Sequence, residues 1–124
     1  MGLIRSAACA VLVCAVAGCG GRIERAADLP IPASDYEVHT ANDAYIACLV
    51  NSARTLDDGK DNVIGFALKI LPLCEMQLAA AEEAASRGAD PFGRHSIKDS
   101  FEQNKEIFAT SIVRRVRLER ELGP

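Results

Sequence analysis

Apolar residues recur every three or four positions along three stretches of the chain, which is the spacing of a helix that buries one face. The pattern predicts helices over about residues 40–56, 61–87 and 96–122. Polar segments separate them, a tight turn at 57–61 and a loop at 90–93. Three helices with short connections predict an all-α fold, a small three-helix bundle in a domain over residues 40–122.

Residues typical of helix ends mark the predicted boundaries. Thr40 and Ser96 each precede an acidic residue by three positions, as in a capping box, and Gly88 is expected to stop the second helix. The predicted core face of the first helix is Tyr45, Cys48, Leu49, Ser52, Ala53 and Leu56. That of the second is Ile64, Ala67, Leu71, Cys74, Leu78, Ala81 and Ala85. That of the third is Ile97, Phe101, Asn104, Ile107, Phe108, Ile112 and Val116, with Glu102, Glu106, Arg114 and Arg117 opposite.

Pro72 interrupts the second predicted helix. A proline cannot donate the backbone hydrogen bond to the residue four positions earlier, and its ring clashes there. We therefore expect a kink or a break at Pro72, and residues 63–71 as a separate short helix remain an open alternative.

Cys48 and Cys74 are expected to form a disulfide that links the first two helices. When these helices fold back on each other about the turn, residues whose numbers sum to about 122 come opposite each other, as these two do. The same register places Leu56 near Phe66, Leu49 near Leu73, and Tyr45 near Gln77 and Leu78. A redox or metal site is the alternative, but the spacing is not that of a catalytic pair, and His39 and His95 lie in unrelated predicted loops.

Residues 1–18 have the features of an export signal. Arg5 supplies a positive start, residues 7–17 are all apolar, and small residues close the segment. The apolar run is shorter than the roughly 20 residues that a membrane-spanning helix needs. A buried N-terminal helix is the alternative interpretation.

The segment Val16-Ala17-Gly18-Cys19 resembles the lipobox of bacterial lipoproteins. The resemblance covers only the N-terminus, and it implies cleavage before Cys19 and a diacylglycerol on its sulfur. Gly20 stands where an inner-membrane retention signal would have aspartate, which implies an outer-membrane anchor facing the periplasm in a host with two membranes. Ordinary cleavage after Ala17 would instead release a soluble chain.

Cysteine parity favours lipidation. The signal peptide removes two of the five cysteines, and a Cys48–Cys74 bond leaves Cys19 without a partner thiol. Residues 19–39 contain paired glycines and two prolines without a sustained period, and they predict a linker between the lipid and the domain.

Composition fits one globular domain: the chain has 124 residues, of which 49% are hydrophobic and 25% charged. The net charge is −3, and loss of Arg5 with the signal makes it −4. This charge argues against a protein built to hold nucleic acid.

The chain contains no phosphate-binding, hydrolase or metalloprotease motif. The acidic pairs Asp57-Asp58 and Glu82-Glu83 are interpreted as solvated surface charge. The basic cluster consists of Arg114, Arg115, Arg117 and Arg120. It either balances the helix dipole or contacts an anionic partner.

These observations predict a non-enzymatic lipoprotein of the cell envelope that needs no cofactor or metal. It would reach the membrane through its lipid and bind an envelope protein or help to maintain the envelope. The alternative is a small-ligand or lipid carrier whose pocket opens at the Pro72 break. An enzyme would require a concave site that gathers His95 with an acid or a hydroxyl.

Overall fold

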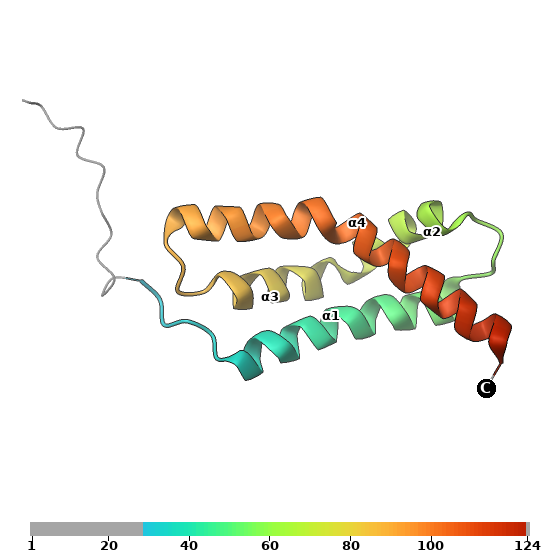
Figure 1. Ribbon diagram of the computed structural model, residues 1–124, viewed down its shortest axis with the longest axis horizontal. Coiled ribbons are helices and arrows are strands. Elements are labelled where there is room, and N and C mark those ends of the chain that lie inside the picture. Colours follow the sequence, from blue (N-terminus) through green and yellow to red (C-terminus); the bar gives the residue numbers. More distant parts are fainter. Residues whose placement is uncertain (1–28, 124) are drawn as a thin grey trace, which may run out of the picture.

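The computed structural model describes residues 29–123, which form a bundle of helices (Figure 1). The predicted signal peptide, Cys19 and the linker up to residue 28 lie outside the described residues. The elements in chain order are α1 (Asp35–Leu56), α2 (Val63–Ile70), the 3-10 helix η2 (Leu71–Cys74), α3 (Glu75–Ser86) and α4 (Pro91–Leu122). Residues 29–123 contain no strand, and the predicted all-α three-helix bundle is confirmed.

The helices run antiparallel to one another in sequence order. α1 crosses the molecule, the continuous run α2–η2–α3 returns beside it, and α4 crosses again over both (Figure 1). The chain therefore enters the bundle at the end where α3 meets α4, and α4 finishes at the opposite end, near the α1–α2 turn.

Pro72 divides the second predicted helix without ending it. The backbone tightens into η2 around Pro72, so that a separate α2 of eight residues precedes it and α3 follows. One core face cannot then continue through the whole run, because a 3-10 helix turns every three residues instead of 3.6. As a result, the prediction that Ile64 faces the core is wrong: Ile64 is 60% exposed, while Phe66 and Ile70 are buried.

The first helix starts earlier than predicted. The capping box is Ser34 with Glu37: the Ser34 backbone N–H donates to Glu37 Oε2 (2.8 Å), and the Glu37 N–H donates to Ser34 Oγ (3.3 Å). The expected start at Thr40 is wrong, and residues 35–39, which include His39, are helical rather than linker. The linker therefore ends at the cap, which satisfies the donors of the first turn.

The third long helix also starts earlier than predicted. The Gly93 N–H donates to Asp90 Oδ1 at 2.6 Å, and Pro91 occupies the first helical position, where its missing N–H costs nothing. The predicted loop at 90–93 and the predicted start at Ser96 are therefore wrong, and His95 lies on α4 rather than in a loop.

The predicted disulfide is present and lies at the centre of the core. Cys48 of α1 and Cys74 of η2 are joined, with Cα atoms 5.8 Å apart, and Cys74 is fully buried. Leu49 and Tyr45 are buried as predicted, but Leu56 and Leu73 are 54% and 57% exposed. The hairpin register is thus correct at the disulfide, and the predicted contacts at Leu56 and Leu73 do not bury those side chains.

The buried face of α4 overlaps the predicted face but differs from it in the middle of the helix. Ala109, Ile112, Val113 and Val116 are buried, whereas Ile107 is 71% exposed and Asn104 is also exposed. Ala109 and Val113 are small enough for close helix packing. Ile112 and Val116 are buried as predicted and Phe101 and Phe108 pack against the core, so the prediction is wrong only at Ile107 and Asn104 and omitted Ala109 and Val113.

The segment before α1 crosses the α3–α4 turn at Gly88. This residue has φ +88°, and a Cβ built on it would lie 2.6 Å from Pro32 Cγ. Gly88 therefore provides both the left-handed turn after α3, as predicted, and room for the entering chain.

Candidate functional site

Two arginines of the predicted basic cluster bind the C-terminal end of α1. Arg117 donates to both carboxylate oxygens of Asp57, from Nε to Oδ2 (2.7 Å) and from Nη2 to Oδ1 (2.8 Å), and also to the Asp61 carbonyl (2.9 Å). Arg120 Nη1 donates to the Asp57 carbonyl at 2.9 Å. We call Asp57, Arg117 and Arg120 the clamp, because together they hold α1 and its turn against α4.

Asp57 is buried, so its interpretation as solvated surface charge is wrong. Its side chain is 0% exposed, and that of Arg117 is 20% exposed. The two hydrogen bonds from Arg117 lower the pKa of Asp57, and the bond from the Gly59 N–H acts in the same direction. The burial of this aspartate depends on a residue 60 positions away. No local pattern in the sequence could reveal it.

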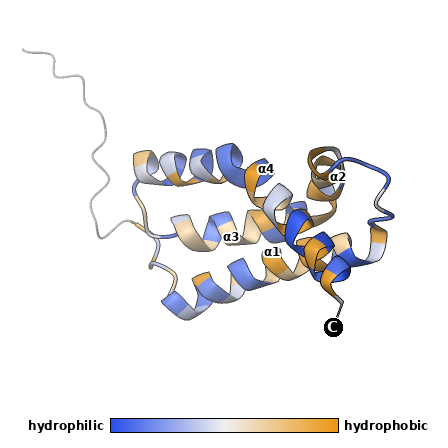
Figure 2. Cartoon of the chain, turned by 45° about the vertical axis from the view of Figure 1, so that its right-hand side comes forward, coloured by the Kyte–Doolittle hydropathy of each residue, from blue (hydrophilic) through white to orange (hydrophobic). Residues whose placement is uncertain are grey.

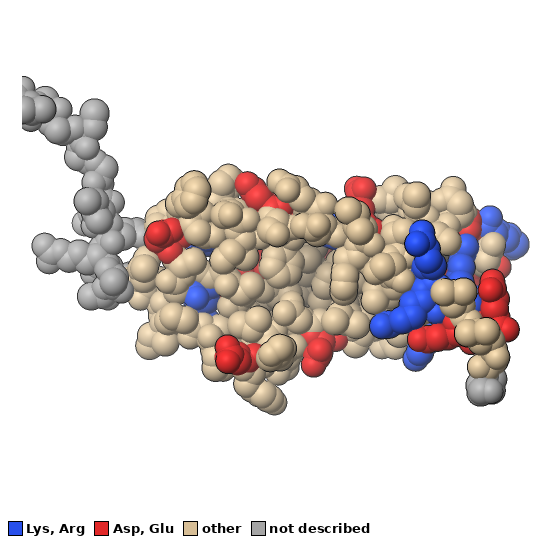
Figure 3. Space-filling model, viewed as in Figure 1, with Lys and Arg blue, Asp and Glu red and all other residues tan. Residues whose placement is uncertain are grey.

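The remaining members of the basic cluster face solvent. Arg114 and Arg115 are exposed, and Arg115 Nε lies 3.7 Å from Glu119 Oε1. Figure 3 shows basic side chains gathered where α4 finishes, with acidic side chains beside them. The structure therefore divides the predicted cluster into two arginines that bind the end of α1, of which Arg120 is itself exposed, and two arginines that do not.

His95 lies in a shallow hollow on α4. Its Nε2 is 3.2 Å from Asp99 Oδ2, and both side chains are more than half exposed. Ser96 and Ser100 line the same hollow and are also exposed. Among residues 29–123, no group of three or more His, Cys, Asp or Glu side chains could hold a metal ion.

A set of large apolar side chains is exposed along the α2–η2–α3 run. It consists of Ile64, Leu68, Leu73 and Met76, and we call it the apolar strip; Met76 is 84% exposed. Figure 2 shows α2 coloured mostly as hydrophobic, unlike the alternating colours of α1. Exposed Lys69 and Glu75 interrupt the strip.

The same run, Val63–Ser86, is long and apolar enough to cross a membrane by length and composition alone. Its inner face nevertheless packs in the bundle. Phe66, Ile70, Cys74 and Leu78 are buried in the core with side chains of α1 and α4. The apolar side chains of this run thus fall into two groups, those buried in the core and those exposed in the apolar strip.

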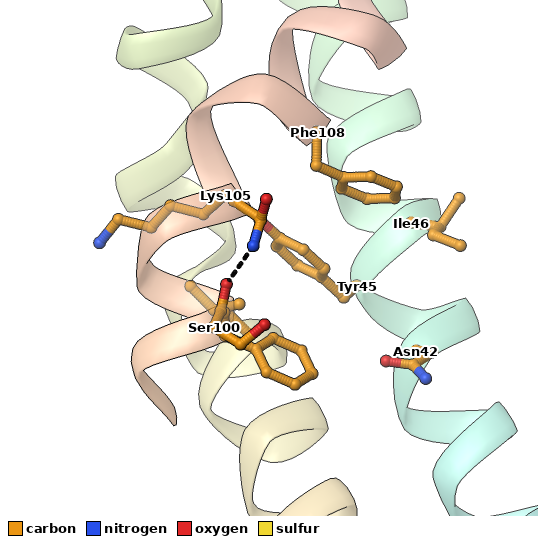
Figure 4. Close-up of a pocket in the computed structure, with 9 residues that line it drawn as sticks. Asn42, Tyr45, Ile46, Ser100, Lys105 and Phe108 are labelled. Carbon is orange, nitrogen blue, oxygen red and sulfur yellow. Dashed lines mark hydrogen bonds between the residues drawn. The ribbon is translucent and has the colours of Figure 1, made fainter. Parts of the chain in front are cut away.

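A groove of about 390 Å³ opens between α1, α3 and α4 (Figure 4). Most of its lining is apolar or aromatic and consists of Tyr45, Ile46, Leu78, Phe101 and Phe108. The polar side chains of the lining are Asn42, Ser100, Asn104 and Lys105. Pro72 does not line this groove, so the pocket is not at the proline break where the carrier alternative placed it. We call this site the α1–α4 groove.

Tyr45 was predicted as a core residue and is 5% exposed, yet its hydroxyl has no hydrogen-bond partner. Its ring stacks on Phe108 with centroids 5.9 Å apart and extends from α1 toward α4 (Figure 4). Burial raises the pKa of the Tyr45 hydroxyl, and the Glu82 and Glu102 carboxylates add to this effect. The hydroxyl therefore stays protonated and can donate at neutral pH.

Comparisons with protein-family models, with curated proteins and with solved structures find no match for this chain. Proposals on its function therefore depend on the residues and geometry described above.

Proposed function

We propose that this protein is a non-enzymatic, lipid-anchored module of the cell envelope that binds another envelope protein through the apolar strip. The observation that carries the proposal is the exposure of four large apolar side chains, Ile64, Leu68, Leu73 and Met76, within the single run α2–η2–α3. Single exposed apolar residues are common on proteins, but several large ones within one short run are typical of an interaction surface.

The shape of the apolar strip favours a helical partner. Ile64 and Leu68 are four positions apart and Leu73 and Met76 three apart, which is the spacing of side chains that enter a groove or pack on a second helix. Lys69 and Glu75 provide charges of both signs beside it. A partner helix with an apolar row and flanking charges would match this surface.

The clamp supports a protein partner rather than an anionic surface. Arg117 and Arg120 are engaged within the chain, and Arg115 lies near Glu119. These contacts within the chain reduce the charge that the basic cluster can offer to lipid headgroups or nucleic acid.

The docking part can be tested with a photo-crosslinking amino acid placed at Met76. Ile107 is the matched control, because it is also exposed and apolar but lies on α4 outside the strip. We expect an adduct of defined mass from Met76, lost when Leu73→Gln is added, and none from Ile107. Equal adducts from both positions, or an adduct that survives Leu73→Gln, would contradict docking through the strip.

The anchoring part has a separate test, the intact mass of the protein extracted from membranes. We expect a chain that begins at Cys19, carries a diacylglycerol and lacks two hydrogens at Cys48 and Cys74. A chain that retains Met1, or one that begins at Gly18 without lipid, would overturn the lipid anchor and leave the docking result unaffected.

A further inference from the structure

Three large apolar side chains are exposed at the end of the bundle where the chain enters. Ile31, Tyr36 and Phe92 are 86%, 79% and 83% exposed. Ile31 belongs to the segment before α1, Tyr36 to the first turn of α1 and Phe92 to the first turn of α4. We call these three the entry-end residues.

Two contacts bring the entry-end residues to the same end of the molecule, although they come from distant parts of the chain. Pro32 lies against the α3–α4 turn, because a Cβ built on Gly88 would be 2.6 Å from Pro32 Cγ. Glu37 Oε1 accepts a hydrogen bond from Arg87 Nη2 at 2.7 Å. Phe92 follows this turn by four positions, and Figure 1 shows α1 and α4 both starting at this end.

The charges at this end nearly cancel. Glu37 and Arg87 form an ion pair, and the Asp90 carboxylate accepts the capping hydrogen bond of α4. Asp35 and Arg94 add one charge of each sign. The basic side chains of the other end, where α4 finishes, lie at the far side of the bundle (Figure 3). The entry end therefore offers apolar contact without a strong field, which suits a neutral lipid surface rather than an anionic one.

The predicted anchor keeps this end, rather than the other, near a bilayer. Ile31 is 12 positions after Cys19 (31 − 19), a stretch that spans at most about 40 Å when fully extended. Leu122 is 30 positions after Phe92 on α4 (122 − 92), which places it about 45 Å further along the helix. A lipid on Cys19 would thus hold the entry end close to the membrane.

We propose that the entry-end residues insert into the interface of a bilayer of electrically neutral phospholipids, with the finish of α4 directed away from it. Tyrosine suits this position, because its ring is apolar and its hydroxyl can stay among the hydrated headgroups. The inference rests on the anchor part of the proposed function. It uses no residue of the apolar strip, which stays available for a protein partner.

The chain contains no tryptophan, so a single introduced tryptophan reports on its own position. Phe92→Trp marks the entry end, Leu122→Trp the far end and Met76→Trp the apolar strip, three sites that are 83%, 83% and 84% exposed. The lipidated protein extracted from membranes is reconstituted into phosphatidylcholine vesicles with brominated acyl chains, which quench tryptophan on contact. Interfacial side chains lie about 5–10 Å into the boundary between headgroups and acyl chains, so we expect quenching of Phe92→Trp to be at least about threefold stronger than that of the other two.

The possible results separate the anchor from the entry-end contact. Protein that does not float with the vesicles would show that the anchor fails, and the inference would fall with it. Protein that floats but is quenched equally at positions 92 and 122 would leave the anchor intact and overturn the contact. Strongest quenching of Met76→Trp would also overturn it, because the bundle would then lie on the apolar strip. Quenching of Phe92→Trp that appears only after anionic lipid is added would contradict the neutral surface.

A second set of variants tests whether the side chains themselves insert. Tyr36→Trp is the reporter here, and it also replaces Phe92→Trp if circular dichroism shows that the latter does not fold. Adding Ile31→Ser and Phe92→Ser should reduce its quenching at least about twofold, because two of the three inserted side chains are lost. Adding Leu118→Ser and Leu122→Ser at the far end is the matched control and should leave the quenching unchanged. Equal effects of the two pairs would overturn the proposal.

Discussion

Replacing Asp57 with asparagine should destabilise the domain far more than the same change at its neighbour Asp58. The Asp57 side chain is fully buried and accepts two hydrogen bonds from Arg117, while Asp58 is 54% exposed and pairs with exposed Lys60. The two substitutions remove the same charge from adjacent positions. Any difference between them therefore measures the clamp.

The magnitude follows from the burial of the two partners. Removing one member of a buried ion pair costs about 3–5 kcal/mol, because the other charge stays without compensation. Arg117 is 20% exposed and keeps its bond to the Asp61 carbonyl, so it is partly compensated. We therefore expect Asp57→Asn to lower the free energy of unfolding by about 2–4 kcal/mol, and Asp58→Asn by less than about 1 kcal/mol.

The pH dependence gives an independent check of the same clamp. Arg117 holds the folded-state pKa of Asp57 below its usual value. The stabilisation is therefore complete above the unfolded-state pKa, about 3.9, and is lost as the pH falls through the folded-state pKa. Protonated aspartate resembles asparagine in charge. The stability gap between the parent and Asp57→Asn should accordingly narrow below about pH 4.

The assay is urea unfolding followed by circular dichroism at neutral and at acidic pH. Adding Arg117→Gln to Asp57→Asn completes a double-mutant cycle, in which the two single costs should not add. Equal costs for the Asp57 and Asp58 variants, or a gap that does not change with pH, would refute the clamp.

Three further predictions concern other parts of the bundle. Replacing both Cys48 and Cys74 with serine should lower stability by about 3–4 kcal/mol in the chain-entropy model, and a melting temperature unaffected by reduction would contradict this. Gly88→Ala should lower the urea midpoint more than Gly59→Ala, because both glycines have positive φ but only Gly88 lacks room for a Cβ. Glu37→Gln should remove part of the acid sensitivity of the domain. Hydrogen bonds from the Ser34 backbone and from the Arg87 guanidinium lower the pKa of Glu37 to about 2. The stabilisation by Glu37 is therefore complete above its ordinary pKa and is lost as the pH falls toward about 2. Stability curves of the parent and the Glu37 variant that stay parallel down to pH 2 would contradict it.

The bundle and its disulfide were predictable because both depend on local periodicity and on one hairpin. The turn after Leu56 sets the register of the two helices, and that register brings Cys48 opposite Cys74. Helix period and cysteine position were separate observations that led to the same pairing. Such agreement between helix periodicity and cysteine position is typical of a sequence that specifies one core.

The starts of α1 and α4 were less predictable, because two sets of residues competed for each cap. For α1 the candidates are Ser34 and Thr40, which both precede an acidic residue by three positions. For α4 they are Ser96, which also precedes an acidic residue by three positions, and Asp90, whose own carboxylate accepts the capping hydrogen bond. Pattern alone favoured the cap nearest the apolar repeat. The structure uses the earlier one in both cases, because the added turns gain backbone hydrogen bonds without breaking the core face.

The α1–α4 groove could not be predicted from periodicity, which marked Tyr45 correctly as buried but could not show that its hydroxyl lacks a partner. Asn104 and Lys105, which line the same groove as Tyr45, are on a helix more than 50 positions later in the chain. The same limit applies to the buried state of Asp57. Sequence patterns thus reveal which face is inside, and long-range contacts decide what each buried polar group does.

The disulfide and the exposed surfaces of this domain are connected through stability. A domain of this size has a small core, and here four large apolar side chains remain on the apolar strip instead of adding to it. Full burial of one such side chain would contribute about 1.5–3 kcal/mol, so leaving several exposed costs an amount comparable with the whole stability of a small protein. The Cys48–Cys74 bond offsets part of that cost by restricting the unfolded chain, which needs no additional apolar burial. A stapled hairpin can therefore leave these apolar side chains on its surface, whereas a reduced chain would have to rely on a core that they do not enlarge.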